Sequence, residues 1–328
     1  MSQYSTPYII SRRTKVKTVW LFSDTGILDQ QAQPVPGVPF QNPVTAGAQH
    51  QHQLSVIVDG HQIWTHQDNR WKRVISAEIQ LHCLCWTAEG QLLVGTAEAR
   101  VAKVENEQLN FLTSFDNIPE RQLWKTPWGG PPDLRSFAIA KDGAIYANIH
   151  VGWIARSKDS GQTWQNLKQG LEMDVHQVAA HPHEMTTVFA ATASGFYFSQ
   201  DQGQTFTRSG QEMPSHYQRS CAVFPGGEVY LASTSRGPHG FAEARLYRSQ
   251  DSGQNWTQVE GLPDQIDRNI DTFQIIIINE ATALVVIEDN QLYQTTDLGY
   301  HWHKIDQQFP RLYGGLVVNE GSSDIRRA

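Results

Sequence analysis

Four copies of one octet constrain the fold of this chain more than any other feature. They share the order Ser/Thr-x-Asp-x-Gly-x-Thr-aromatic, with Asn and His replacing the second Thr in the last two copies, and they occupy Ser157–Trp164, Ser199–Phe206, Ser249–Trp256 and Thr295–Trp302. Their aspartates, Asp159, Asp201, Asp251 and Asp297, are 42, 50 and 46 residues apart. Self-similarity at such a period indicates a repeat architecture.

Each octet has the composition of a hairpin turn. Its Asp can accept hydrogen bonds from the amides that follow. Its glycine supplies the positive φ of the reversal, at Gly161, Gly203, Gly253 and Gly299. The aromatic residue opens the next strand and buries a large side chain against a neighbouring unit. These residues explain a fold and no reaction, so we assign them a structural role.

Short alternating apolar runs fill the sequence between the octets. They form units of four predicted strands, which begin at Leu54, Gln80, Leu134, Val175, Arg219 and Asp271. Four-stranded antiparallel sheets arranged radially avoid long exposed edges. The sequence therefore predicts an all-β chain, a β-propeller that occupies residues 1–328 as a single domain.

The two ends of the chain are expected to close the ring. Residues 1–53 are irregular, but they contain predicted strands near Trp20 and Ile27. The tail Leu312–Asn319 can pair with these strands and complete a seventh blade. Six blades remain the alternative if the N-terminal segment only decorates the ring.

Charge and cysteine content exclude several classes of protein. The net charge is −7 over 328 residues, with a pI of about 6.0 and no long basic run, which argues against nucleic-acid or membrane-surface binding. The three cysteines, Cys83, Cys85 and Cys221, form no disulfide framework.

The first residues lack the features of a signal peptide, and no apolar run approaches ~20 residues. We expect a soluble cytoplasmic protein.

Polar residues recur where the predicted blades open at one end of the central channel. If the octet turns lie at the other end, the starts of the first strands present His82, Arg135, His176, Arg219 and Asp271, with Tyr217 close by. The loops after the second strands present His150, Arg236 and His239. Convergent polar groups in a concave site predict a ligand pocket, although each residue alone could be an ordinary ion pair or a satisfied histidine.

Three chemistries suit this set. Arginines can hold a carboxylate or phosphate by bidentate hydrogen bonds, with His82, Arg135, Tyr217, Arg219, Arg236 and His239 as the ligand-binding group. Histidines with an Asp could bind a divalent metal such as Zn²⁺ in the channel, although no compact ligand motif marks it. Proton transfer by His150 or His176, tuned by Asp271, would make these three residues catalytic.

The octets resemble the Asp-box, or BNR, repeat of sialidases and sortilin-type receptors. The segments Tyr146–Gly152, Asp174–Val178 and Asn269–Thr272 are similar to recurrent segments of uncharacterised bacterial BNR-repeat propellers. The resemblance implies a propeller whose octet turns lie on the face away from the ligand, and it implies no known reaction.

The preferred hypothesis is a His- and Arg-lined pocket for a small anionic ligand, with hydrolase or lyase chemistry as an extension. The first alternative is a non-enzymatic scaffold that binds a protein through rim loops near Trp124 and Trp128. The second is a sialidase-like glycosidase, against which Tyr8–Arg13 lacks the Arg-Ile-Pro order and no glutamate is clearly paired with Tyr217.

Overall fold

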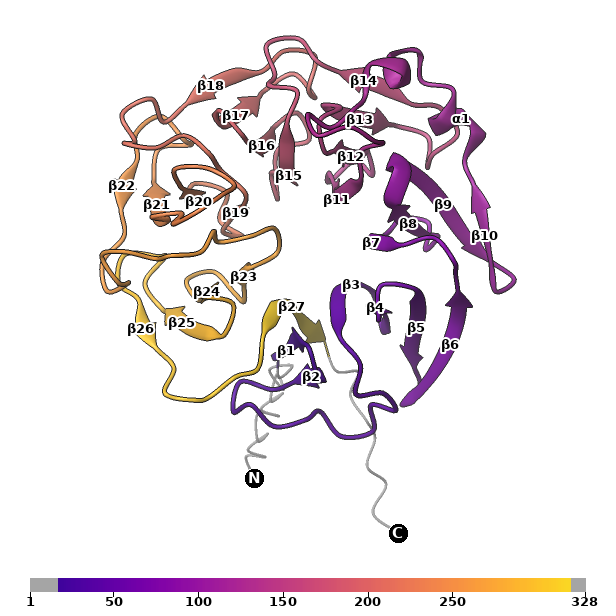
Figure 1. The fold of residues 1–328 in the computed structure, drawn as a ribbon, viewed down its shortest axis with the longest axis horizontal. Helices are drawn as coiled ribbons and strands as arrows, with labels where there is room; N and C mark the ends of the chain where they lie inside the picture. The colour runs from indigo at the N-terminus through magenta and orange to yellow at the C-terminus, as the bar shows by residue number, and fades with distance from the viewer. Residues whose placement is uncertain (1–16, 320–328) are drawn as a thin grey trace, which may run out of the picture.

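The strands form seven antiparallel sheets arranged as blades around a central axis (Figure 1). A computed structural model describes residues 17–319. The innermost strand of each sheet contacts the innermost strand of the next, all the way around the ring. The structure therefore confirms the all-β propeller, with seven blades rather than six.

Six blades each have four strands, in sequence order from the axis outwards. Blade 1 is β3 (Val44–His50), β4 (Gln53–Val58), β5 (Gln62–Gln67) and β6 (Arg70–Ser76); blade 2 is β7 (Leu81–Trp86), β8 (Leu92–Thr96), β9 (Arg100–Glu105) and β10 (Gln108–Phe111); blade 3 is β11 (Leu134–Ile139), β12 (Ile145–Ile149), β13 (Ile154–Ser157) and β14 (Gln165–Leu167). Blade 4 is β15 (Val175–Ala180), β16 (Val188–Thr192), β17 (Gly195–Ser199) and β18 (Thr207–Ser209); blade 5 is β19 (Cys221–Val223), β20 (Tyr230–Thr234), β21 (Arg245–Ser249) and β22 (Thr257–Gln258); blade 6 is β23 (Ile275–Ile277), β24 (Ala283–Ile287), β25 (Gln291–Thr295) and β26 (His303–Lys304).

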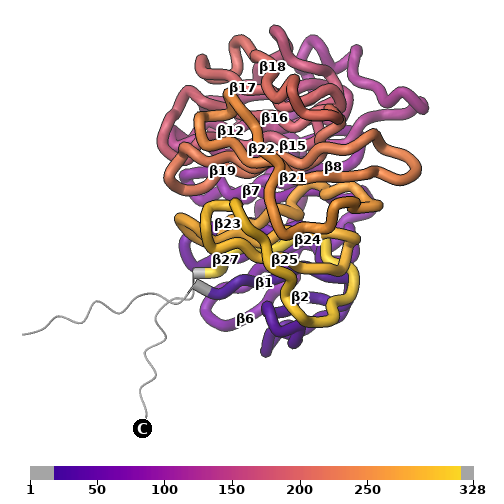
Figure 2. The backbone as a smooth tube through the Cα atoms, turned by 90° about the vertical axis from the view of Figure 1, so that its left-hand side faces the viewer, coloured from indigo at the N-terminus to yellow at the C-terminus, as the bar shows by residue number. Residues whose placement is uncertain are grey.

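Blade 7 closes the ring from both ends of the chain, as predicted. Its inner strand is β27 (Leu312–Asn319), which pairs with β1 (Lys17–Ser23), and β1 pairs with β2 (Gly26–Leu28). A single bridge between Leu28 and Pro34 stands where other blades have a fourth strand. The side view also places β1 and β27 together (Figure 2). Of the predicted closing segment, residues 1–16 lie outside the described part of the chain.

The expectation that residues 1–53 are irregular up to Leu54 is wrong for β3, the inner strand of blade 1. Its sequence, Val-Thr-Ala-Gly-Ala-Gln-His, has few bulky apolar residues and follows Pro43, so it carries little strand signal. Crowding explains the small residues, because a Cβ on Gly47 would stand 2.5 Å from the ring of Phe22.

Each octet forms the turn between the third and fourth strands of its blade. In the first copy Asp159 Oδ1 accepts hydrogen bonds from Ser157 Oγ at 2.8 Å and from the amide of Thr163 at 2.8 Å, and Ser157 Oγ accepts one from the amide of Gly161 at 2.9 Å. The copies at Asp201, Asp251 and Asp297 repeat these three bonds. These hydrogen bonds stabilise the turns, and they occupy the carboxylates of all four aspartates.

Within residues 17–319, helical structure occurs only between two strands of blade 2 and in the connection from blade 2 to blade 3. It comprises η1 (Ala97–Ala99), α1 (Thr113–Asp116) and η2 (Pro119–Leu123). Over residues 17–319 no helix has the length and apolar character to cross a membrane. The three cysteines are buried and free.

Candidate functional site

One β-bulge recurs near the start of the inner strands. The residue left unpaired by the register shift is Thr45 in blade 1, His82 in blade 2, Arg135 in blade 3, His176 in blade 4 and Tyr313 in blade 7. Arg219 and Phe273 hold the corresponding places in blades 5 and 6, directly before residues that accept backbone hydrogen bonds from the second strand. Because a bulge re-aims the side chain, each blade presents one residue at the same level of the ring.

Acidic residues occupy a second repeated position, two residues before the bulge. They are Asp133, Asp174 and Asp271. Asp133 Oδ1 lies 3.3 Å from His82 Nε2 of the preceding blade. Asp271 Oδ2 likewise lies 2.8 Å from an Arg219 nitrogen of the preceding blade. These carboxylates tie the start of one inner strand to the start of its neighbour, and the His82 imidazole lowers the pKa of Asp133.

His150, Asp174 and His176 form the most compact group at this end of the channel. His150 follows β12 and is 4% exposed, and His176 is fully buried in β15. Both Nε2 atoms lie 3.3 Å from Asp174 Oδ1. Burial alone would raise the pKa of Asp174, but the two imidazoles outweigh it and hold that pKa well below its ordinary value. Burial, reinforced by the charge of Arg135, lowers the pKa of His150 despite the contact with Asp174.

Tyr217 links this group to Arg219. Its ring centroid lies 4.8 Å from that of His176, and its hydroxyl oxygen accepts a hydrogen bond of 3.2 Å from Arg219 Nε. Burial opposes the charge of Arg219, but Asp271 and Tyr217 outweigh it and raise the pKa of this arginine. Arg219 is therefore held in one orientation by a carboxylate and a phenol.

Arg135 is the exception among these charged groups. Its half-buried guanidinium makes no hydrogen bond and no ion pair within residues 17–319. Burial is the main cause that lowers its pKa, and Arg219 adds repulsion, while Asp271, Tyr217 and Asp133 attract it without contact. The net effect lowers the pKa, which means that the folded state disfavours the charged form of Arg135. An anionic partner would stabilise that charge.

Residues of blade 6 reach across the ring axis. Thr272 Oγ1 lies 3.2 Å from the carbonyl oxygen of His176 in blade 4 and 3.3 Å from that of Arg219 in blade 5. Phe273, at φ +68°, packs against an apolar cluster of blades 2 and 3. The prediction that Asp271 begins the blade 6 strand is therefore corrected: Phe273 holds the bulge position, and Asp271 belongs to the preceding carboxylate series.

Two predicted ligand-binding residues do not join this group. Arg236 binds Glu243 of its own loop at 2.6 Å, with its side chain 65% exposed. His239 is exposed in the same loop and makes no interaction within the described residues. That loop joins β20 to β21 and has no counterpart of similar sequence in the other blades. Equivalent positions in the repeats therefore could not predict where these two side chains lie.

The predicted rim tryptophans differ from each other. Trp128 is exposed at 72%, and its ring centroid lies 5.5 Å from that of His150. Trp124 is only 6% exposed and packs against Phe115, so its assignment as an exposed rim residue is wrong. The short helices α1 and η2 fold this part of the connection onto the blade and bury the ring.

Sequence analysis did not assign Asp133 and Asp174 to the site. The signal that could have found them is the spacing Asp-x-Arg and Asp-x-His, in Asp133-Leu-Arg135 and Asp174-Val-His176. Asp271-Thr-Phe273 repeats the spacing with an aromatic residue in the last place.

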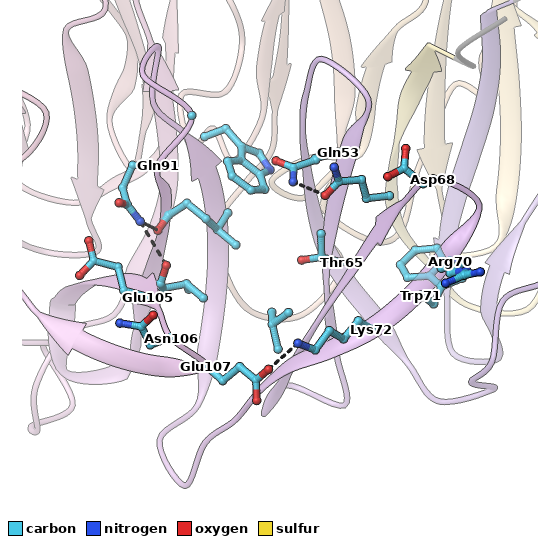
Figure 3. Close-up of a pocket in the computed structure, with 16 residues that line it drawn as sticks. Gln53, Thr65, Asp68, Arg70, Trp71, Lys72, Gln91, Glu105, Asn106 and Glu107 are labelled. Atoms are coloured by element: carbon cyan, nitrogen blue, oxygen red, sulfur yellow. Dashed lines mark hydrogen bonds and ion pairs between the residues drawn. The ribbon is translucent and has the colours of Figure 1, made fainter. Parts of the chain in front are cut away.

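A large surface cavity lies elsewhere, between blades 1 and 2 (Figure 3). It encloses about 990 Å³ and is lined by Trp71 and Trp86 among polar side chains. Lys72 and Glu107 close one side with an ion pair of 2.5 Å. No predicted ligand-binding or catalytic residue lines this groove.

Comparison with known proteins finds limited sequence similarity to two kinds of longer protein. No family model matches the sequence. A xyloglucanase of Hypocrea jecorina is 35% identical over 106 residues, which is 32% of this chain and 12% of that protein. A vacuolar protein sorting/targeting protein 10 of Verticillium alfalfae is 29% identical over 68 residues, 21% of this chain and 4% of that protein. The chain thus matches only a small part of these much longer relatives.

Solved structures share the fold at low identity. An ancestral GH74 enzyme has a TM-score of 0.62 at 16% identity, over 88% of this chain and 40% of that one. A YCF48 protein bound to a D1 peptide has a TM-score of 0.59 at 10% identity, over 86% and 93%. A functionally unknown protein from Desulfotomaculum acetoxidans has a TM-score of 0.63 at 11% identity, over 93% and 100%. These likenesses show the propeller fold alone.

Proposed function

We propose that this propeller binds a small anionic ligand at the end of the channel where the inner strands begin, with Arg135 as the primary contact and Arg219 beside it. The observation that carries the proposal is the guanidinium of Arg135, half-buried and without a partner among the described residues, with its pKa lowered by burial and by Arg219. A carboxylate or phosphate would supply two parallel charge-assisted hydrogen bonds to such a group.

The other charges near Arg135 are already engaged. Asp133 contacts His82, Asp174 contacts two histidines, and Asp271 pairs with Arg219. Arg135 is the cation left over from this pairing, which supports a role toward a ligand rather than toward the fold.

Hydrolase or lyase chemistry is an extension of this proposal. With no metal bound, His150 is the better candidate for a base, because burial and Arg135 lower its pKa and keep the ring neutral near neutral pH. His176 is fully buried and Asp271 is paired with Arg219, so both are better suited to position other groups.

Glycosidase chemistry of the sialidase type has weaker support. A general acid for glycoside cleavage needs a raised carboxyl pKa. The pKa values of Asp133 and Asp174 are lowered instead. The hydroxyl of Tyr217 contacts Arg219 rather than a glutamate.

An acidic peptide or protein segment is the second candidate ligand. Trp128 and Phe241 are 72% and 71% exposed, on loops that the strand order places at the same end of the blades as Arg135. Exposed aromatic residues at the same end as a cation that has no partner within residues 17–319 suit a peptide with a carboxylate and apolar neighbours. The similar YCF48 structure holds a peptide, which supports this candidate by analogy of fold only.

Titration calorimetry and thermal-shift measurements with citrate, succinate, inorganic phosphate and an acidic peptide test the proposal. We expect at least one anion to bind, and Arg135→Met to weaken it at least about tenfold, since a hydrogen bond to a charged group contributes roughly 1.5–3 kcal/mol. Arg236→Met is the matched control, because this arginine pairs with Glu243 outside the group. Equal affinities in the two variants would refute the assignment of Arg135.

A further inference from the structure

Three side chains from two neighbouring blades converge on one carboxylate oxygen. His150 comes from the loop after β12 of blade 3, Asp174 from the residue before β15, and His176 from the bulge of β15 in blade 4. One nitrogen or oxygen of each lies within 4.8 Å of the other two.

The hydrogen bond on the far side of His176 fixes which ring nitrogen faces Asp174. His176 Nδ1 lies 2.5 Å from the carbonyl oxygen of Gln218. A carbonyl oxygen can only accept, so Nδ1 carries the hydrogen and a neutral ring presents its lone pair at Nε2.

Two buried acceptors therefore face each other. His176 Nε2 and Asp174 Oδ1 are both buried, and neither has a hydrogen-bond partner within the described residues. They lie 3.3 Å apart. Buried polar atoms without a partner are rare in folded proteins, and two facing lone pairs require a positive centre between them, which is either a bound cation or a proton that makes His176 an imidazolium.

We infer that His150, Asp174 and His176 bind a divalent transition-metal ion, with zinc as the best match. Four ligands about 2.0–2.1 Å from a tetrahedral ion lie about 3.3–3.4 Å from one another. Both histidine nitrogens lie 3.3 Å from the Asp174 oxygen, which agrees with this spacing. Imidazole and carboxylate donors suit zinc among the first-row metals. The carbonyl of Gln218 orients His176 as outer-shell groups orient metal-binding histidines.

Three protein ligands leave one coordination position for another group. The charge of Arg135 acts on His150, so a ligand at that position would lie near an unpaired guanidinium. The metal would also offset the three carboxylates of this region, which outnumber the two arginines. The inference rests on the proposed function only in placing a ligand at this end of the channel.

A neighbouring pair supplies the matched control. His82 Nε2 and Asp133 Oδ1 also lie 3.3 Å apart, and His82 Nε2 also lacks a hydrogen-bond partner among the described residues. No third donor joins this pair, because the group around Asp174 is the one cluster of three such residues in the described chain. A bare His–Asp contact can thus be compared with the three-residue group in one protein.

Metal analysis and competition titration of the full chain, purified without a histidine tag, provide the test. We expect one equivalent of Zn²⁺, and Co²⁺ in its place should give the visible spectrum of a tetrahedral site. Asp174→Asn and His150→Gln should each weaken Zn²⁺ binding by more than about tenfold, since even outer-shell changes cost 10–100-fold. His82→Gln should leave it unchanged.

Failure of the wild-type chain to bind Zn²⁺ at micromolar concentration would overturn the inference, and His176 would then be an imidazolium paired with Asp174. An equal loss in His82→Gln would overturn it as well. Thermal melts identify any variant that does not fold, and the wild-type titration decides the question in that case. Zinc binding without any Arg135-dependent anion binding refutes the proposed function alone, and the reverse result refutes the metal site alone.

Discussion

Replacing Arg135 with methionine should make the free protein more stable while it removes the anion site. The guanidinium is half-buried without a partner in the described chain, and its pKa is lowered, which means that the folded state disfavours its charge. Methionine keeps a similar length and removes the charge. A residue retained for binding at the expense of stability is expected to respond in this way.

The expected gain is about 1 kcal/mol in the free energy of unfolding, within the range of single stabilising changes, and the Tm should rise on the order of 2 °C. Solvent access keeps the gain small. The comparison variant is Arg219→Met, which leaves Asp271 unpaired. Because the Asp271 side chain is 46% exposed, we expect a loss of about 1–2 kcal/mol rather than the 3–5 kcal/mol of a fully buried pair.

Urea unfolding followed by tryptophan fluorescence, together with calorimetric melts, measures both variants without ligand. Arg135→Met should unfold at a higher urea concentration than the wild type and Arg219→Met at a lower one. A loss of more than about 1 kcal/mol in Arg135→Met would show that the guanidinium has a structural partner, and the argument for a ligand would fail with it.

Three further outcomes are expected. Gly261→Ala should cost about 2 kcal/mol more than Gly240→Ala in urea unfolding, because both glycines have positive φ but only at Gly261 would a Cβ meet a backbone oxygen, that of Trp302 at 2.1 Å; equal losses would contradict this. Burial alone would raise the pKa values of Asp251 and Asp297, but hydrogen bonds within their octets lower both to about 2. Since an unfolded aspartate titrates near ~3.9, the stability that they supply is complete above about pH 4 and is lost as the pH falls toward 2; melting temperatures that stay constant between pH 4 and 2 would argue against it. Trp128→Ala should leave the Tm unchanged but weaken an acidic peptide more than citrate, and equal effects on both would remove the case for a peptide.

The fold was largely predictable because each octet forms its turn through contacts between residues that are close in the sequence. Its hydrogen bonds run from Asp159 to residues within four positions of it, so the turn needs no distant partner. A regular spacing of such turns fixes the number of strands between them. The closing strands near Trp20 and Leu312 were predictable for a related reason. A closed propeller needs a last blade, and the strands at the two ends of the chain can pair to form it.

The strand β3 could not be predicted in the same way. Its inner position against Phe22 requires small residues such as Gly47, and small residues carry little strand propensity. The requirement comes from a neighbouring blade and has no local signature.

The candidate site was predictable in part. The repeat frame gave the bulge residues Arg135, His176 and Arg219, because equivalent positions lie at the same level of the ring. It did not give the roles of Asp133 and Asp174, since each carboxylate acts on a histidine of another blade. The frame also failed for Arg236 and His239, whose loop departs from the repeat.

The sequence alone determined the turns, the number of strands in a blade and the level at which polar residues appear, because these depend on contacts within one repeat. Only the tertiary structure decided which charges remain unpaired. Arg219 finds Asp271 and His82 finds Asp133 across blade boundaries, while Arg135 finds no partner within the described chain. Pairing between blades depends on side-chain reach over a few ångströms, since the energy of an ion pair falls steeply with separation and exposure, and a repeat period does not encode that distance.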